Sequence, residues 1–288
     1  MESYLRLVDG ILRYGSVKED RTGVGTVGLF GVQLKHDMSK GFPLLTSKKM
    51  YTRAIMVELE GFIKGITDKK WYQDRKCNIW NEWCNPKKVP YGHDEETKQR
   101  MMEERDLGPV YGFQWRHFGT EYSGYEKDYT NEGTDQIAKI VEILKKSPSS
   151  RRMVVSAWNP SDLPSMALEP CHYSWEVNVM DGKLNLKWNQ RSIDTMLGLP
   201  FNIASYGVLL HLLALEGGFK PGVLTAHLGD THIYKNHFEG AREQLLNIPK
   251  KLPSLKINDF NSIFDFTHEQ VEFVGYEHHP KMSFPIAV

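Results

Sequence analysis

A hairpin signal in the second half of the chain constrains the fold most strongly. Residues 174–180 and 184–190 both alternate apolar and polar side chains, and an Asp-Gly pair, Asp181-Gly182, stands between them. That pair between two alternating runs is the strongest short-range signal for a β-hairpin. The sequence therefore predicts two paired strands that turn at residues 180–183. Because the ends of a hairpin are neighbours, Cys171 and Arg191 are predicted to lie close together.

The stretch around this hairpin carries reactive and polar side chains. Cys171 and His172 follow Pro170, which cannot lie inside a helix, so the thiol is expected near the start of an extended segment. A nearby arginine would lower the thiol pKa and bind an anion, which indicates a nucleophilic thiolate beside an anion site. An inert, buried cysteine is the alternative. A plain core would leave many polar groups unpaired here, which favours a site: Arg191, Ser192, Asp194, Asn202 and Ser205.

Composition limits the function classes. The 288 residues include 36 basic and 36 acidic side chains, so no charge excess points to nucleic acid, and any anion site must be local. Cys77, Cys84 and Cys171 lack metal or disulfide spacing, so we expect no metal site and a reducing cytoplasm, which for a virally encoded protein is the host's. No apolar run approaches the roughly twenty residues that cross a bilayer, and the charged first residues are unlike a signal peptide, so no membrane association is expected.

Apolar periodicity predicts the main elements. Helices are predicted at residues 3–14, 51–63, 136–145 and 207–217, and strands at 27–34 and 153–158. Residues 85–105 are polar and are predicted to form a surface excursion with one short helix. Within the second helix, Glu58 shares a side with Ile55 and Phe62, which predicts a buried carboxyl with a raised pKa suited to proton transfer; a solvated carboxylate is the alternative.

Long motifs then carry a family resemblance. They are PCH at 170–172, QRSIDTMLGLPFNIASY at 190–206, LGDTHIYKNH at 228–237, DRTGVGT at 20–26 and LGPVYGFQWRHFG at 107–119. Together they cover nearly the whole chain, which resembles the thymidylate synthase and pyrimidine hydroxymethylase superfamily. The resemblance implies an α/β (α+β) fold with a large mixed sheet covered by helices. It also implies one catalytic domain over residues 1–288 and a homodimer formed through the sheet face.

The resemblance implies reductive methylation of dUMP to dTMP with 5,10-methylenetetrahydrofolate as cosubstrate. The Cys171 thiolate would add to C6 of the pyrimidine, because C5 is a poor nucleophile until C6 is saturated. Glu58, Tyr111 and His172 would handle protons, and Asn202 would read O4 and N3 of the base. The other implied nucleotide contacts are Arg21, Arg191, Ser192, Gln190, Asp194, His232 and Tyr234, with Arg151 and Arg152 donated across the dimer interface. The implied folate contacts are Lys48 (or Lys49), Ile79, Trp80, Leu168, Asp194, Gly198, Phe201 and Val288.

Several residues depart from the family pattern. Where a typical member reads ELLWF, residues 58–62 read Glu-Leu-Glu-Gly-Phe, and Glu169, Glu176 and Asn189 also replace other residue types. Phage hydroxymethylases, in which water instead of hydride captures the exocyclic methylene, share some of these changes. Extra polar groups could hold such a water, or they could only repack a helix face. A dUMP hydroxymethylase therefore stays open, as do a dCMP or ribonucleotide variant and a weakly catalytic, RNA-binding scaffold.

Overall fold

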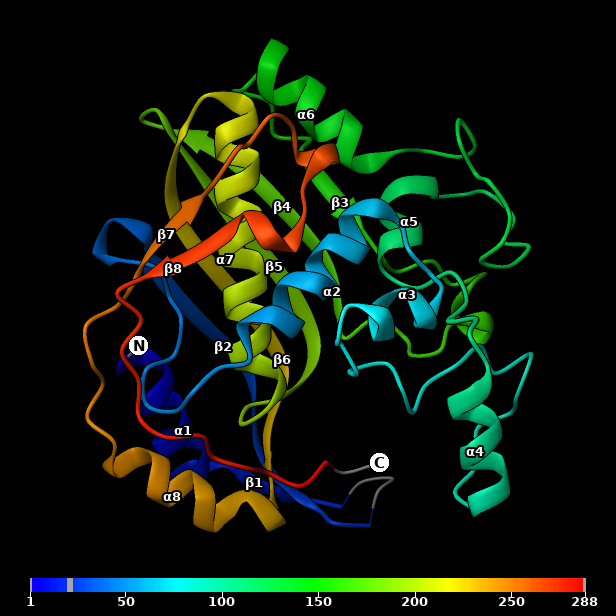
Figure 1. Cartoon of the computed structure of the whole chain (residues 1–288). Helices are drawn as coiled ribbons and strands as arrows, with labels where there is room; N and C mark the ends of the chain where they lie inside the picture. Colours follow the sequence, from blue (N-terminus) through cyan, green and yellow to red (C-terminus); the bar gives the residue numbers. More distant parts are fainter. Residues whose placement is uncertain (1, 20–22, 287–288) are drawn as a thin grey trace. The chain divides into compact units, whose positions relative to one another are not determined.

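The structure is a computed structural model that describes residues 2–19 and 23–286 (Figure 1). Arg21 and Val288, two of the predicted site residues, lie outside the described residues. Contacts divide the chain into two compact units. Unit 1 comprises Met1–Tyr51, Val179–Asn258 and Val271–Val288, and unit 2 comprises Thr52–Asn178 and Asp259–Gln270.

Unit 1 holds long strands and a buried helix. Its helices are α1 (Glu2–Tyr14), α7 (Gly198–Gly217) and α8 (Phe238–Leu246), with short 3-10 turns at Met38–Lys40 and Lys235–His237. Its strands are β1 (Ser16–Lys18), β2 (Thr26–Asp37), β5 (Lys183–Asp194), β6 (Lys220–Tyr234), β7 (Ser254–Ile257) and β8 (Val271–Val274). β1 and β2 are antiparallel, as are β2 and β6, whereas β5 and β6 are parallel. The parallel pair requires a crossover, and α7 supplies it.

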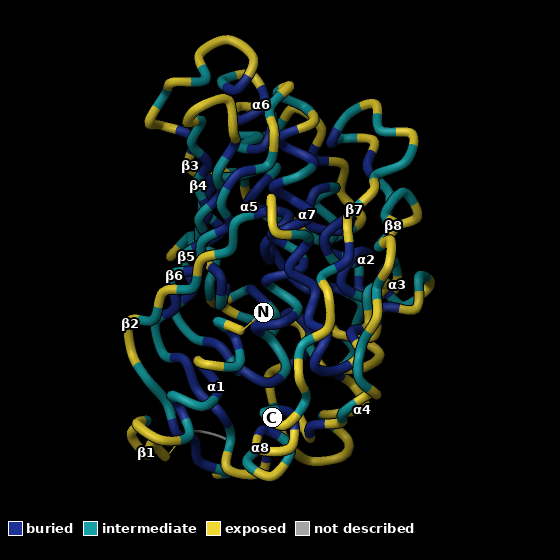
Figure 2. The backbone as a smooth tube through the Cα atoms, turned by 90° about the vertical axis from the view of Figure 1, so that its left-hand side faces the viewer, coloured by how far each residue is buried: buried dark blue, intermediate teal, exposed yellow. Residues whose placement is uncertain are grey.

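The crossover helix α7 forms the core of unit 1. Figure 1 shows it lying over one face of β5 and β6, and Figure 2 shows it mostly in the colour of buried residues. Among the described residues, α7 is the one helix whose length and apolar composition would allow it to cross a membrane. However, 67% of that stretch is buried inside the protein, as in a core helix. The expectation that no apolar run approaches this length is therefore corrected, because the helix begins at Gly198 and not at residue 207.

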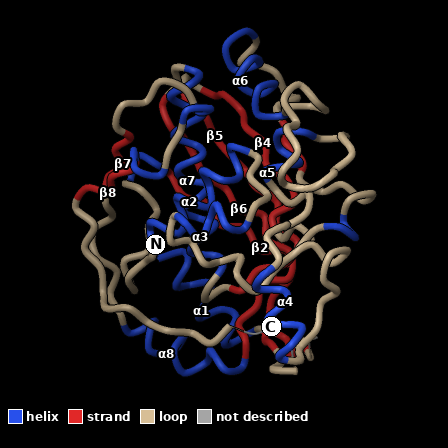
Figure 3. The backbone as a smooth tube through the Cα atoms, turned by 45° about the vertical axis from the view of Figure 1, so that its right-hand side comes forward, coloured by secondary structure: helices blue, strands red, loops and turns tan. Residues whose placement is uncertain are grey.

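Unit 2 is made of shorter elements. Its helices are α2 (Thr52–Lys64), α3 (Lys69–Asp74), α4 (Glu95–Glu103), α5 (Gly112–His117) and α6 (Gln136–Lys146). Its strand β3 (Val154–Ser156) pairs antiparallel with β4 (His172–Met180), which runs into unit 1 at Val179. Further 3-10 turns lie at Leu163–Ser165, Ile263–Asp265 and His268–Gln270. Figure 3 shows α4 set between long loops, as expected for a surface excursion with one short helix.

The strand order of the main sheet is β1-β2-β6-β5-β4-β3, and β7 pairs with β8. With both parallel and antiparallel pairs and covering helices, the predicted α/β fold with a large mixed sheet is confirmed. The predicted turn is also confirmed, because Asp181 and Gly182 both have positive φ, 50° and 71°, as a two-residue type I′ turn requires. β5 is longer than predicted, so Arg191 lies inside the strand and not at its end.

Gly108 should be far less replaceable than Gly182. Both glycines have φ of +71°, but a Cβ on Gly108 would lie 1.8 Å from the Ser165 carbonyl oxygen, whereas a Cβ on Gly182 would meet open space. We expect Gly182→Ala to cost about 1–2 kcal/mol of unfolding free energy from the left-handed backbone alone. Gly108→Ala adds a backbone clash and should cost roughly 3 kcal/mol or more. Urea unfolding of both variants measures the difference, and equal losses would contradict the clash.

Candidate active site

Cys171 lies at the start of β4, as the preceding proline predicts. The residue is half-buried, and its backbone N–H donates to the hydroxyl oxygen of Tyr111 at 2.8 Å. The hydrogen bond joins residues 60 positions apart in the sequence and fixes the backbone that carries the thiol. A half-buried cysteine on a fixed backbone has the placement that a nucleophile needs.

Tyr111 sits in an aromatic stack within unit 2. Its ring lies 4.3 Å from the His172 ring and 4.8 Å from the Phe62 ring, both close to parallel, and Trp80 meets it edge-on at 6.0 Å. Burial lowers the pKa of His172 to about 3, so its imidazole is neutral at physiological pH. His172 can therefore exchange hydrogen bonds with a substrate or water, but it does not form a charged pair with the thiolate.

Glu58 has the raised pKa that the helix pattern predicts. It lies on α2 and is half-buried as a residue, less than the helix pattern predicts, but desolvation of its carboxyl raises the pKa to about 7, while the Trp80 indole N–H partly opposes this rise. That indole nitrogen makes no hydrogen bond of standard geometry, so its effect is a weak, longer interaction. A carboxyl that titrates near neutral pH can both give and take a proton during turnover.

The two departures next to Glu58 have structural partners. Glu60 is buried, and its carboxylate accepts from the Lys64 ammonium at 2.6 Å and from the His268 backbone N–H and ring Nδ1 at 2.9 and 2.8 Å. A Cβ on Gly61 would already lie 2.4 Å from the Tyr72 ring, so only glycine fits there. These contacts support the interpretation that Glu60 and Gly61 repack a helix face.

Asn202 and Gln190 form a fixed pair of amides in unit 1. Gln190 Oε1 accepts from Trp188 Nε1 at 3.0 Å and from Asn202 Nδ2 at 2.9 Å, and Gln190 Nε2 donates to the Ser192 carbonyl at 3.1 Å. An indole N–H can only donate, so it fixes which end of the Gln190 amide faces it. The Asn202 amide is thereby oriented, with its Oδ1 and one N–H left for other partners.

Asp194 and His232 are placed by neighbouring strands. They face each other in the register of β5 and β6. Asp194 Oδ1 accepts from the backbone N–H groups of Met196 and Leu197, at 2.8 and 3.1 Å, which shapes the entry to α7. His232 Nδ1 lies 3.0 Å from Asp230 Oδ1, and the Tyr234 ring meets the imidazole edge-on.

Lys48, one of the two lysines expected to contact the acidic glutamate tail of the folate, lies deeper than such a contact requires. It is buried, its ammonium donates to the Met196 carbonyl, and burial lowers its pKa to about 8 while Asp194 opposes the shift. Its neighbour Lys49 is exposed and is the lysine of the pair that can meet a tail in solvent.

The structure places the other predicted residues at several depths. Gly198 begins α7, which also carries Phe201 in its first turns. Arg151 and Arg152 are exposed, and in the described part of the chain neither forms an ion pair. The remaining residues are partly exposed: Arg191, Ser192, Phe201, Leu168 and Ile79.

The sequence reasoning missed supporting residues. Trp188 orients Gln190, and Asp230 both pairs with His232 and accepts from Lys18 at 2.7 Å. Asp230 could have been found from its spacing, because residues two apart on a strand share a face. Trp188 gave no such signal, because its indole N–H meets the Gln190 side chain only once β5 has folded.

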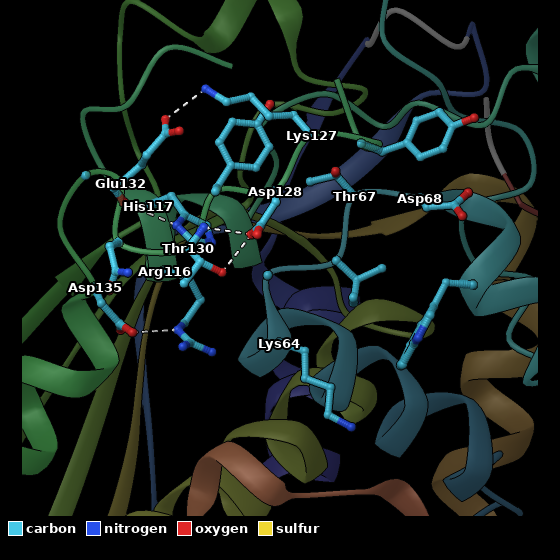
Figure 4. Close-up of a pocket in the computed structure, with 17 residues that line it drawn as sticks. Lys64, Thr67, Asp68, Arg116, His117, Lys127, Asp128, Thr130, Glu132 and Asp135 are labelled. Carbon is cyan, nitrogen blue, oxygen red and sulfur yellow. Dashed lines mark hydrogen bonds and ion pairs between the residues drawn. The ribbon is translucent and has the colours of Figure 1, made fainter. Parts of the chain in front are cut away.

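A cleft of about 710 Å³ in unit 2 contains none of the predicted site residues (Figure 4). Charges on its wall are matched locally: Arg116 pairs with Asp135 at 2.9 Å, and Lys127 pairs with Glu132 at 2.8 Å. Figure 4 shows these pairs on separate sides of the cleft, with Lys64 on another side. Because each lysine and arginine on this wall already has an acidic partner, the cleft offers no unpaired cation for an anionic substrate.

A half-buried cysteine, a neutral histidine and a carboxyl that titrates near pH 7 are the groups that a nucleophilic enzyme uses. The thymidylate synthase family model matches residues 2–288, and the chain therefore belongs to the thymidylate synthase family. A curated relative, the bifunctional dihydrofolate reductase-thymidylate synthase of Paramecium tetraurelia, is 44% identical over 285 residues. That match covers 99% of this chain and 61% of the relative, so the chain spans about three fifths of the relative's length. Neither finding favours the hydroxymethylase alternative.

Glu60→Gln should lower stability at neutral pH. Burial alone would raise the pKa of Glu60, but the donors Lys64 and His268 outweigh it, and the pKa falls below its usual value. A depressed folded pKa gives stability above the unfolded value that is lost as the pH falls through the folded value. We expect a loss of roughly 1–3 kcal/mol at pH 7, shrinking as the pH drops below about 4.3.

Glu142→Gln is the matched control for Glu60→Gln. Glu142 also pairs with a lysine four residues later, Lys146, but both side chains are exposed. Such exposed pairs contribute about 0.3–0.5 kcal/mol. Urea unfolding at pH 7 and pH 3.5 measures both variants, and equal effects would refute a special role for the buried carboxylate.

Proposed function

We propose that this chain catalyses the reductive methylation of dUMP to dTMP with 5,10-methylenetetrahydrofolate. The observation that carries the proposal is the half-buried Cys171, whose backbone N–H donates to the Tyr111 hydroxyl. The family model that matches residues 2–288 includes both residues. The dihydrofolate reductase named in the relative is not part of the proposal, because the family model that matches this chain is that of thymidylate synthase.

The residues of unit 2 supply the chemistry. The Cys171 thiolate attacks C6 of the uracil ring, and the electron pair of the C5–C6 bond becomes available at C5. When bound, methylenetetrahydrofolate supplies the one-carbon unit and the hydride. Glu58, with a pKa of about 7, exchanges the proton that leaves C5 and stabilises the changing charge at O4. Trp80 and Tyr111 form an aromatic wall that suits the flat pterin of the folate.

Asn202 selects uracil in this proposal. Its orientation by Gln190 leaves an N–H for the O4 acceptor and Oδ1 for the N3–H donor. Cytosine presents an amino group and an unprotonated N3 at these positions, so both contacts would be mismatched. The other assigned groups hold the nucleotide: His232 and Tyr234 the sugar hydroxyl, and Arg191 and Ser192 the phosphate.

We also propose one catalytic domain over residues 1–288 that acts as a homodimer. The family match spans both units, which supports a single functional domain. The exposed Arg151 and Arg152, which lack ion-pair partners among the described residues, suit a phosphate presented by a second copy of the chain. Sedimentation measures the state, and a monomer that binds dUMP tightly would contradict the dimer.

A cytoplasmic location completes the proposal. None of Cys77, Cys84 and Cys171 forms a disulfide, as is usual in reducing compartments. Imaging of the full-length tagged protein tests this, and accumulation in the secretory pathway would contradict it.

Incubation of the protein with dUMP and methylenetetrahydrofolate should yield a nucleotide heavier by CH2, with dihydrofolate detected by absorbance. Cys171→Ala should lower turnover by at least about 10³-fold, since no other group can form the C6 bond, while the dUMP dissociation constant changes little. A product heavier by CH2O would instead mean that water captures the methylene. Full activity of the variant would refute the nucleophile, and no turnover by the wild type would favour a binding scaffold.

Asn202→Asp should weaken use of dUMP without simply creating a dCMP enzyme. The new carboxylate would face Gln190 Oε1, another acceptor, which the Trp188 N–H holds in place. We expect kcat/KM for dUMP to fall by about 10²-fold or more, because one buried polar contact is lost and one becomes repulsive. Trp188→Phe in the same background should release Gln190 to rotate and improve use of dCMP. Unchanged preference in both variants would remove Asn202 as the base reader.

A further inference from the structure

Lys69 is a fully buried cation in unit 2. It is the first residue of α3 and is 1% exposed. Its ammonium donates to three backbone carbonyls, those of Asn81 at 3.2 Å, Trp83 at 3.0 Å and Met101 at 2.6 Å. An ammonium has three N–H donors, so all of them are used on main-chain acceptors.

This arrangement is costly. Among the described residues no carboxylate lies within 4 Å of the Lys69 ammonium, and Glu104 acts on it only at longer range. Burial lowers the pKa of Lys69, which shows that its environment disfavours the charge. A buried charge without an ionic partner is retained only where its hydrogen bonds are complete, and here all three go to main-chain carbonyls.

Two of the three carbonyls held by Lys69 belong to the turn that carries Trp80, and the third, that of Met101, belongs to α4. In residues 78–83 the N–H of Asn81 donates to the Asn78 carbonyl at 3.2 Å, and that of Trp83 donates to the Trp80 carbonyl at 3.1 Å. Lys69 binds the carbonyls one and three residues beyond Trp80. Gln73, also on α3, donates to the Asn81 side chain at 3.0 Å and forms a second attachment.

Trp80 in turn packs against the residues that hold the thiol. Its buried indole meets the rings of Phe62 and Tyr111 edge-on, at 6.4 and 6.0 Å, and Tyr111 accepts from the Cys171 N–H. A shift of the 78–83 turn would move the indole along the Tyr111 ring. Such a shift changes the aromatic wall proposed for the folate, whereas the groups assigned to the sugar and the phosphate belong to other elements.

We propose that Lys69 is a positioning residue that holds the 78–83 turn through its carbonyls and thereby sets Trp80 against Tyr111 for folate binding. The proposal rests on the proposed function, in which Trp80 contacts the folate. Neither the family motifs nor the family match assigns a role to Lys69. The specific expectation is that loss of this ammonium impairs folate use and spares nucleotide binding.

Lys69→Met tests the proposal, because methionine keeps an unbranched side chain and removes all three donors. We expect the KM for methylenetetrahydrofolate to rise by about tenfold, while the dUMP dissociation constant, measured by calorimetry, stays within about twofold. Lys70→Met is the matched control, since Lys70 is half exposed and pairs with Asp74 on the surface. It should behave as the wild type in both measurements.

Gln73→Leu keeps the proposal testable if Lys69→Met does not fold. It removes the second attachment of Asn81 and should raise the folate KM in the same direction by a smaller factor. The proposal is overturned if Lys69→Met weakens dUMP and folate equally, or if it changes neither. An unchanged folate KM in Gln73→Leu overturns it where Lys69→Met is unfolded.

Failure of the proposed function would be recognised separately, because the wild type would then not turn over dUMP. In that case hydrogen exchange of the amides in residues 78–83 decides the positioning role alone. Faster exchange there in Lys69→Met than in Lys70→Met supports it, and equal exchange overturns it.

Discussion

The hydrogen bond from the Cys171 N–H to the Tyr111 hydroxyl is the contact on which the chemistry of unit 2 depends. Tyr111 stands at the start of α5, and its ring lies between Phe62 of α2 and His172 of β4. One side chain therefore connects a helix, a strand and a loop that are distant in sequence. Stacked aromatic pairs add about 0.5–1.5 kcal/mol each beyond burial, so the thiol backbone is held by packing as well as by a polar contact.

The same stack explains the protonation states of the site. His172 is buried against aromatic rings, and burial lowers its pKa to about 3. Burial acts on the Glu58 carboxyl in the opposite sense and raises its pKa to about 7. One apolar environment thus keeps both groups uncharged below neutral pH. The carboxyl alone titrates in the physiological range, which makes it the group able to move protons.

The sequence predicted the elements whose pattern is local. The Asp181-Gly182 turn needs only positive φ at two adjacent residues, and α1 and α2 follow from apolar spacing. The start of α7 was missed because Asn202 and Ser205 interrupt the apolar run, although Pro200 lies in the first turn of the helix, where proline is tolerated. The Trp188–Gln190–Asn202 chain was not predictable, since it needs a strand and a helix in one specific register.

The partners of Glu60 likewise depend on tertiary structure, because His268 is more than two hundred residues away. Because Lys64 and His268 satisfy this carboxylate, Glu60 has a structural role. Residues two apart on a helix point in different directions, so Glu60, with its carboxylate satisfied by Lys64 and His268, does not add a polar group on the side of Glu58.

Gly61 is three residues from Glu58 and does share its side of the helix. The space that a tryptophan would fill there in a typical family member is taken by the ring of Tyr72, which is fully buried and donates from its hydroxyl to the Ile66 carbonyl at 3.0 Å. An aromatic ring has thus been exchanged for another, from α3 instead of α2. Glu60 and Gly61 consequently add no group that could hold a water beside Glu58, as the proposed hydride transfer requires, because a dry site protects a reactive methylene from water.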